Sequence, residues 1–455
     1  MDPTATDEPT RRWASILARP WLLAFLPINA ATAAFGLSLQ LLILGAHGSV
    51  IQWALAATVF NGALIVSSII WGYLADKYPL RRRFLLINYL GFAAIYAALF
   101  FLTSFNELIL LYTLVGVLTP AGVSASNLLI LEQFSEGERP TAYASFQEIS
   151  ILGSIVGGLV GFFWLEANEM LRPLLFVLAG FALASAVVVW FGVKDSHRPL
   201  PSSETTRDPS GLLSRLRHSV ALRGTVPFFP PFPQFQPGVV HRAWRRLREE
   251  ARHELPLIFG ASLLFSLSAN LFNVSYTFYL AAVGISFAGI FLVNVSNSVA
   301  QAIFFPLSGS LSKRGGADRL VRLSSLLRGV GYLIVVAFTF DRVFAGSLAF
   351  GANVLVYAIL GAAIALYSTA SSLVLFRTLH ERDAGSMLGL SSALGGVAAI
   401  AGAFLSGVLS FYGSYRLTFL IAAVGLLASL PLWAAADAAY IRRRMGGAVP
   451  PPAPA

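Results

Sequence analysis

Long apolar stretches alternate with short charged segments along almost the whole chain. As a helix, a stretch of about 20 residues is long enough to cross the roughly 30 Å of membrane hydrocarbon. The first stretch is longer than the roughly 7–15 apolar residues of a signal-peptide core, so it counts as a span. We therefore predict an all-α polytopic membrane protein with twelve transmembrane helices. Their expected positions are 21–44, 51–74, 84–104, 107–131, 141–164, 172–193, 256–282, 286–308, 320–340, 345–372, 384–410 and 415–436.

A long polar segment divides the predicted helices into six and six. Within it, the proline-rich stretch 227–237 cannot form a regular helix. Residues 240–255 have a basic amphipathic pattern, which predicts either a helix on the anionic membrane surface or a solvated linker helix. The expected organisation is a cytoplasmic N-terminal segment at 1–20, a six-helix half at 21–193, a cytoplasmic central loop at 194–255, a second six-helix half at 256–440 and a disordered tail at 441–455.

The composition agrees with a membrane protein, because 56% of the residues are hydrophobic and only 12% are charged. The surface of a soluble domain of this length would need far more charge. The net charge of +10 does not indicate nucleic-acid binding, since the basic residues lie in short segments between helices. Most of them fall on one side, which places both termini in the cytoplasm. There is no cysteine and the six histidines are scattered, so we expect no cofactor and no metal site.

A charged hairpin at 72–83 joins the second and third predicted helices, and part of it is repeated in the second half. A shift of 243 residues also places Glu138-Arg139 on Glu381-Arg382. Two six-helix halves related in this way form a parallel repeat, from which many secondary transporters are built. A shift of 237 residues places Gly72 on Gly309, Leu74 on Leu311, Lys77 on Arg314 and Arg82 on Arg319.

The hairpin sequence at 72–77, Gly-x-Leu-Ala-Asp-Lys, resembles the loop signature of the major facilitator superfamily of transporters. Pro79 and Leu80 depart from that signature, and Lys313 replaces the acid in the second half. The fifth predicted helix is rich in glycine, as in the drug/proton antiporters of that family, but no proline follows its glycines. The arginine that those exporters carry in the fourth helix is also absent from 115–122. The resemblance implies the fold of the superfamily and leaves the substrate open.

The resemblance also implies a gate at the cytoplasmic ends of the helices. The Asp76 carboxylate would pair with basic groups in one conformation and lose them in the other, while Gly72 would let a neighbouring helix approach closely. The alternative is that these charges are solvated and determine only the topology. The residues expected to form the gate are Gly72, Asp76, Lys77, Arg81, Glu132, Arg139, Gly309 and Arg314.

Two charged residues lie deep inside predicted spans, away from their ends, where a charge is costly and usually functional. Glu148 is the candidate proton carrier if it faces a cavity. Its alternative role is a structural one, paired with Arg139 or hydrogen-bonded at the inner gate. Arg328 is expected to extend toward the cytoplasmic surface, because helices 3, 6, 9 and 12 are peripheral in the family it resembles.

Several predicted helices carry a single polar stripe, with residues that recur every three or four positions and so share one face. Such stripes indicate a common wet cavity, and their amides, hydroxyls and aromatic rings suit a neutral or weakly charged organic solute. The alternative is that they form hydrogen bonds between helices. The residues expected to line the cavity are Asn29, Thr32, Gln40, Gln147, Asn270, Asn273, Asn297, Gln301, Asn353 and Tyr357.

These patterns favour a secondary active transporter of a small organic solute, working by alternating access as a multi-pass protein of the cell membrane. Protons are one candidate coupling ion, and both export of lipophilic compounds and uptake of a sugar or metabolite remain open. The alternative is a non-pumping protein of the same fold, such as a lipid flippase or a solute sensor. No nucleotide-binding loop or catalytic dyad is visible, so no enzymatic activity is expected. The expected partners are the solute and membrane lipids, with no nucleic acid, and we expect a monomer.

Overall fold

The computed structural model describes residues 20–78, 80–102, 104–134, 139–168, 170–193, 254–339, 347–378 and 384–446. Every regular element in these ranges is helical, and twelve helices are long and apolar enough to cross a membrane. The predicted fold class is therefore confirmed. The elements of the first half are η1 (Pro20–Ala24), α2 (Phe25–Gly45), α3 (Val50–Lys77), α4 (Arg81–Phe101), α5 (Phe105–Gln133), α6 (Arg139–Asn168) and α7 (Leu174–Gly192).

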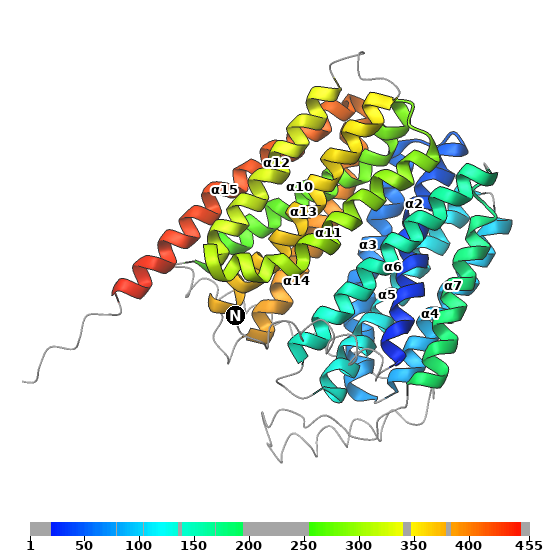
Figure 1. Ribbon diagram of the computed structural model, residues 1–455, viewed down its shortest axis with the longest axis horizontal. Coiled ribbons are helices and arrows are strands. Elements are labelled where there is room, and N and C mark those ends of the chain that lie inside the picture. The colour runs from blue at the N-terminus through cyan, green and yellow to red at the C-terminus, as the bar shows by residue number, and fades with distance from the viewer. Residues whose placement is uncertain are drawn as a thin grey trace, which may run out of the picture.

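The second half begins at residue 255, on the left in Figure 1. Residues 1–19, 194–253 and 447–455 lie outside the described part of the chain, and with them the predicted amphipathic helix. The elements of the second half are α10 (Leu255–Ala282), α11 (Phe287–Gly315), α12 (Ala317–Phe338), α13 (Ser347–Thr378), α14 (Ala384–Val408), η2 (Leu409–Gly413) and α15 (Tyr415–Gly446).

The same packing pattern occurs in both halves. In the first half, α2 packs against α6 and α7, α4 packs against α5 and α7, and α3 packs against α5. The corresponding helices of the second half do the same: α10 packs against α14 and α15, α12 against α13 and α15, and α11 against α13. The two six-helix halves predicted from the sequence repeat are therefore present as equivalent bundles.

Two helix pairs hold the halves together, α3 against α14 and α6 against α11. On α6, glycines allow close approach both to α2 in the same half and to α11 in the other half. A Cβ atom at Gly157 would overlap the backbone of Ala30 on α2, and one at Gly161 would overlap the ring of Phe291 on α11. Small residues allow helix backbones to approach closely in a membrane, where dispersion contacts drive helix association. The glycine-rich pattern of the fifth span is thus explained by packing on both of its sides.

The contacts between the halves are concentrated toward one end of the molecule. Gly407 near the end of α14 touches Ala54 near the start of α3, and Gly396 touches Ile65 further along. At the other end the halves diverge (Figure 1), and a Cβ atom at Gly72 would meet no described atom within 4 Å. The family resemblance implies that this gate closes when the protein faces outward, so the close helix approach expected at Gly72 stays a prediction. Under the predicted orientation, the protein is closed on the outer side and open toward the cytoplasm.

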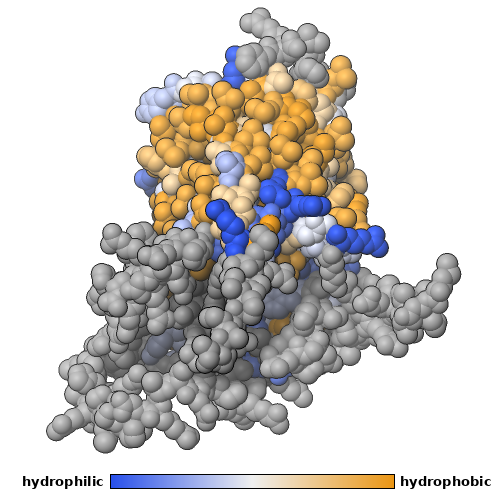
Figure 2. All heavy atoms as spheres, turned by 90° about the vertical axis from the view of Figure 1, so that its left-hand side faces the viewer, coloured by the Kyte–Doolittle hydropathy of each residue, from blue (hydrophilic) through white to orange (hydrophobic). Residues whose placement is uncertain are grey.

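A broad apolar surface covers the outside of the second half, as Figure 2 shows for the face on which α12 and α15 lie. Hydrophilic residues gather along its lower edge in that view. Such a band is what the hydrocarbon of a bilayer requires of a helical membrane protein. Exposed apolar side chains of this face are Leu323, Leu326, Val330 and Leu333 on α12 and Leu417, Leu420, Ile421 and Val424 on α15.

Stacked aromatic rings fill the interior of the second half. Phe272 stacks on Tyr332 with ring centroids 4.0 Å apart and on Tyr276 at 4.7 Å, and Tyr276 stacks in turn on Tyr357 at 4.7 Å. Phe272, Tyr276 and Tyr332 are at most 1% exposed. Offset stacking of large rings contributes beyond the area that they bury, so this bundle has a densely packed centre.

Candidate functional site

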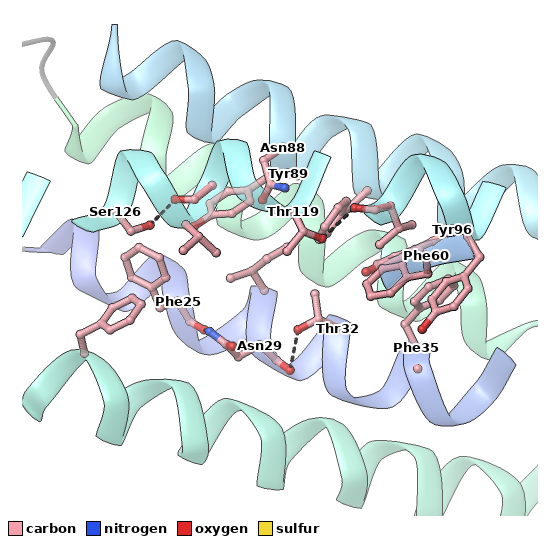
Figure 3. Close-up of a pocket in the computed structure, with 18 residues that line it drawn as sticks. Phe25, Asn29, Thr32, Phe35, Phe60, Asn88, Tyr89, Tyr96, Thr119 and Ser126 are labelled. Carbon is pink, nitrogen blue, oxygen red and sulfur yellow. Dashed lines mark hydrogen bonds between the residues drawn. The ribbon is translucent and has the colours of Figure 1, made fainter. Parts of the chain in front are cut away.

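The first half has a cavity of about 280 Å³ inside its helix bundle (Figure 3). Its walls come from five helices, α2 to α6. We call it the aromatic cavity, because eight of its lining residues are Phe or Tyr. The lining residues are Phe25, Ile28, Asn29, Thr32, Phe35, Gly36, Phe60, Asn88, Tyr89, Phe92, Tyr96, Tyr112, Val115, Thr119, Gly122, Val123, Ser126 and Phe146.

Ring contacts hold the walls of the aromatic cavity in place. Phe35 of α2 stacks on Tyr96 of α4 with centroids 4.3 Å apart, and Phe60 of α3 stacks on Tyr112 of α5 at 4.4 Å. Each pair joins two different helices. A binding site lined by rings that are already packed needs little ordering when an apolar ligand enters.

The serine and threonine hydroxyls in the wall donate hydrogen bonds to their own helix. Thr119 donates to the Val115 carbonyl at 2.7 Å, and Ser126 donates to the Gly122 carbonyl at 2.6 Å. Thr32 donates weakly, at 3.3 Å, to the Asn29 carbonyl. These three bonds are drawn in Figure 3. They leave lone pairs on the hydroxyl oxygens as acceptors for a bound molecule.

Two tyrosine hydroxyls in the wall have no hydrogen-bond partner among the described residues. Tyr89 and Tyr96 are 2% and 0% exposed, and the oxygen of each is buried. An unpaired buried hydroxyl costs free energy, and a ligand that accepts its proton recovers it. Asn29 donates to the Phe25 carbonyl at 2.7 Å and to Ser150 at 3.3 Å, so its side-chain carbonyl remains available as an acceptor.

The chemistry of the aromatic cavity favours an uncharged aromatic or lipophilic group. None of the described residues that line it carries a charge. Burying an unpaired ion in such a wall would be costly, whereas a ring could stack on the aromatic side chains. The two free tyrosine hydroxyls would orient a ligand by one or two hydrogen bonds.

Of the residues expected to line a cavity, Asn29 and Thr32 lie in the wall of the aromatic cavity. Gln40 lies further along α2 and is half-buried, and its side-chain oxygen has no partner among the described residues. Gln147 and Asn273 are exposed, on α6 and α10. None of these last three belongs to the wall of the aromatic cavity.

Four other expected residues, in the second half, form hydrogen bonds between or along helices. Asn297 of α11 donates to the Tyr357 carbonyl of α13 at 2.9 Å and accepts from Gln301 at 2.6 Å. Asn353, which is 1% exposed, accepts from the Tyr276 hydroxyl at 2.9 Å. These bonds match the alternative interpretation of the polar stripes, and the cavity role expected of Asn297, Gln301 and Asn353 stays a prediction.

Asn270 also bonds along its own helix, because it donates to the Ser266 carbonyl at 2.9 Å. The side chain of Tyr357 takes part in the ring stack of the second half, 4.7 Å from Tyr276. Neither residue is in the wall of the aromatic cavity. The polar stripe on α10 is nevertheless partly open, since Asn270 is half-buried and Asn273 is exposed.

Arg81, expected in the gate, forms a buried ion pair with Glu132. The Arg81 Nη2 to Glu132 Oε1 distance is 2.8 Å, and the two side chains are 3% and 6% exposed. Arg81 also donates to the carbonyls of Ala75 and Tyr78 at the end of α3. The pair therefore fastens the end of α3, the start of α4 and the end of α5 together.

A second ion pair occupies the equivalent place in the other half. Asp318 at the start of α12 pairs with both terminal nitrogens of Arg377 at the end of α13. Their side chains are 15% and 25% exposed, so water screens this pair more than the first one. Sequence reasoning did not single out this pair.

The other expected gate residues are less informative. Arg314 is exposed, and Gly309, like Gly72, has no described atom within 4 Å of a Cβ position. The side chains of Asp76, Lys77 and Arg139 lie outside the described part of the structure. A gate that includes them therefore stays a prediction.

The two charges inside spans occupy different surroundings. Glu148 is half-buried on α6, outside the wall of the aromatic cavity. Arg328 is 3% exposed on α12 and donates to the Tyr332 hydroxyl at 2.7 Å. The expectation that Arg328 extends to the cytoplasmic surface is wrong, because its guanidinium lies among aromatic rings inside the second half.

The prediction missed the contribution of α4 to the cavity wall. Asn88, Phe92 and Tyr96 recur every four residues and Tyr89 lies next to Asn88, so the four share one side of that helix. This pattern was visible in the sequence, but α4 corresponds to a span that the family resemblance treats as peripheral. Asn88 donates to the Leu118 carbonyl at 2.8 Å, which ties this face to α5.

Together these features define a polytopic helical membrane protein with two equivalent six-helix halves and a cavity inside one of them. The Major Facilitator Superfamily matches residues 12–253 and 258–449, and the chain belongs to this family. It is 28% identical over 198 residues to the multidrug resistance protein MdtG of Yersinia enterocolitica. That match covers 41% of this chain and 46% of the relative, so the chain spans less than half the length of that protein.

Two solved structures share the fold over almost their whole length. Both are crystal structures of the nucleoside transporter NupG, one of them of a mutant form. The mutant form has a TM-score of 0.65 at 12% identity and covers 92% of this chain and 99% of its own. The other has a TM-score of 0.62 at 13% identity and covers 93% and 98%. At these identities the similarity shows the arrangement of the helices.

Proposed function

We propose that this chain is a secondary active transporter that carries a small organic solute by alternating access. The observation that carries the proposal is the aromatic cavity, which lies inside a membrane-spanning bundle whose two halves touch at one end and diverge at the other. Alternating access requires a binding site and two halves that can exchange which end is closed. The family membership supports the same mechanism.

The solute class follows from the cavity wall. Eight aromatic rings and no charge favour a molecule with an aromatic or lipophilic body. The hydroxyls of Tyr89 and Tyr96 favour one or two hydrogen-bond acceptors on it. We therefore propose a solute that is neutral or carries a single charge. The name of the relative MdtG, a multidrug resistance protein, supports export over uptake.

The gate predicted from the sequence is part of this proposal. Asp76 would pair with basic residues when the cytoplasmic ends approach each other, with Lys77, Arg139 and Arg314 as candidates. The Arg81–Glu132 pair supports this role indirectly, because it fixes the ends of α3, α4 and α5 as one unit. Asp76→Asn should then slow transport while the protein still inserts and folds. Unchanged flux in Asp76→Asn vesicles would remove Asp76 from the gate.

Transport is tested with the purified protein in liposomes. A panel of lipophilic aromatic compounds is first screened for those that raise the melting temperature, since a ligand that binds the folded state stabilises it. Flux of each stabilising compound is then measured with and without a pH gradient. The proposal predicts flux of at least one such compound in liposomes with the protein and none in empty ones. Binding without flux would indicate a solute sensor instead.

A further inference from the structure

The second half has a smaller cavity, of about 190 Å³, between α10, α13 and α14. We call it the serine cavity, since hydroxyl groups form much of its wall. They belong to three helices, so a polar group in the cavity would be surrounded by hydroxyls from three sides. The residues that provide the hydroxyls are Ser262, Ser266, Tyr367, Ser371, Ser372 and Ser391.

Some of these hydroxyls are already bonded and others are free to donate. Ser372 donates to the Ser368 carbonyl at 2.8 Å, and Ser371 donates weakly to the same carbonyl at 3.4 Å. Ser266 and Ser391 lie in the wall, and their hydroxyls form no hydrogen bond with any other described residue. A hydroxyl in such a wall can donate to a bound acceptor without breaking an existing bond.

Arg328 lies behind the serine cavity. Its guanidinium is 5.3 Å from the ring centroid of Phe265, and Phe265 stacks face to face on Tyr367 with centroids 3.4 Å apart. Tyr367 is itself part of the cavity wall. Two stacked rings therefore connect the cation to the cavity.

The charge of Arg328 is not compensated within the described part of the chain. Its Nε donates to Tyr332, but its Nη1 is buried without a partner. Arg81, Arg322 and Arg377 each form an ion pair with another described residue, whereas Arg328 forms none with the described residues. A buried cation is costly unless an anion or hydrogen bonds balance it, and its field reaches several ångströms in an interior of low dielectric constant.

We propose that the serine cavity is a subsite for a monoanionic carboxylate of the transported solute. The serine hydroxyls donate hydrogen bonds to the carboxylate oxygens, and Arg328 supplies the positive potential that favours the ionised form. A dianion such as a phosphate monoester would need a second cation, and a cationic solute is repelled. The inference rests on the proposed transport function and gives the sign of the single charge that the solute carries.

Binding to the full-length protein in lipid nanodiscs tests the subsite without requiring transport. The probes are 2-naphthoate and 2-naphthamide, which share one ring system and differ in charge. Calorimetry should show the wild-type protein binding the carboxylate at least tenfold more tightly than the amide. Arg328→Gln should reduce that ratio to about one, and Arg328→Lys should retain most of it. The matched control is Arg322→Gln, on the same helix but 32% exposed, which should leave the ratio unchanged.

A second variant tests the subsite independently, in case Arg328→Gln does not fold. Ser266→Ala combined with Ser391→Ala removes two free hydroxyls at half-buried positions, and it should lower carboxylate affinity three- to tenfold with the melting temperature unchanged. If Arg328 had only a structural role, Arg328→Gln would have a lower melting temperature but the same ratio of carboxylate to amide affinity as the wild-type protein. That result would overturn the proposal. No preference for the carboxylate in the wild-type protein also overturns it. Failure of the transport proposal has a different signature, in which the carboxylate binds but no solute crosses the membrane.

Discussion

Arg81 and Asp318 occupy equivalent positions in the two halves, 237 residues apart, and carry opposite charges. Each lies at the start of a helix and pairs with a residue at the end of the next one, Arg81 with Glu132 and Asp318 with Arg377. The repeat has thus kept an ion pair at this place and reversed its polarity. The first pair joins the start of α4 to the end of α5, and the second joins the start of α12 to the end of α13. Each therefore fixes the cytoplasmic end of its own half under the predicted orientation.

The first prediction concerns the difference in burial between these pairs. Glu132→Gln leaves the Arg81 charge buried without its partner, which should lower stability by about 3–5 kcal/mol. Arg377→Gln breaks a more exposed pair and should cost about 1 kcal/mol. Melting curves of the purified variants in one detergent measure both. Equal losses in the two variants would show that burial does not set the strength of these pairs.

A charge exchange extends this test. Arg81→Glu combined with Glu132→Arg gives the first half the polarity of the second. It should recover part of the stability lost in Glu132→Gln but not all of it, because the bonds from Arg81 to the Ala75 and Tyr78 carbonyls are absent. A double variant no more stable than Arg81→Glu alone would mean that the ion pair itself contributes nothing.

The second prediction concerns the glycines of α6. Gly157→Ala places a methyl group against the Ala30 backbone, which cannot turn aside as a side chain can. We expect a loss of about 1–3 kcal/mol. Gly180→Ala on α7 is the matched control, because a Cβ there meets no described atom within 4 Å. That control should be neutral or gain up to about 1 kcal/mol, since alanine is the better helix former. A stable Gly157→Ala protein would argue against the close contact of α2 and α6.

The third prediction separates ligand binding from packing in the aromatic cavity. Tyr96→Phe keeps the ring that stacks on Phe35 and removes a buried hydroxyl that has no partner. Stability should therefore stay the same or rise, while affinity for a hydrogen-bonding solute should fall about two- to tenfold. Tyr412→Phe, 76% exposed in η2, is the control. A fall in melting temperature with unchanged affinity would assign the hydroxyl a structural role.

The fourth prediction tests proton coupling. Glu148→Gln removes the membrane-embedded carboxylate of α6 and should abolish accumulation driven by a pH gradient, while exchange of solute without a gradient continues. Glu166→Gln changes an exposed carboxylate on the same helix and should leave both activities intact. Flux assays in liposomes at two internal pH values distinguish these cases. An unaltered response to the gradient in Glu148→Gln would exclude this residue as the proton carrier.

The fold was predictable from the sequence because the bilayer imposes it. Apolar segments of sufficient length and a charge bias between loops leave few arrangements open, and the hairpin at 72–83 with its repeat indicated two equivalent halves. Asn29 and Thr32 were also predicted to line a cavity, and they do lie in a cavity wall. Their neighbours Phe25 and Phe35 were not singled out, because an apolar residue in a span looks the same whether it faces lipid, protein or a cavity.

The polar stripes show why the rest of the site was harder to predict. Asn297 and Asn353 lie on regular helical faces, as the pattern required, but their side chains bond to a neighbouring helix. A polar stripe in the sequence predicts that one face of a helix is polar, but it does not predict whether that face contacts a cavity or another helix. Arg328 was misplaced for a related reason, since the preference of arginine for the membrane surface was applied without the rings of Phe265 and Tyr332 that surround it.

The ion pairs bear on any attempt to rebuild this protein from one of its halves. Each pair lies within a single half, Arg81 with Glu132 and Asp318 with Arg377, so a chain made of two copies of either half would keep an ion pair at both places. Such a chain would instead lose the contacts of α3 with α14 and of α6 with α11, which join different halves. Rebuilding the protein therefore depends on the surfaces of these four helices, whatever the polarity of the ion pairs.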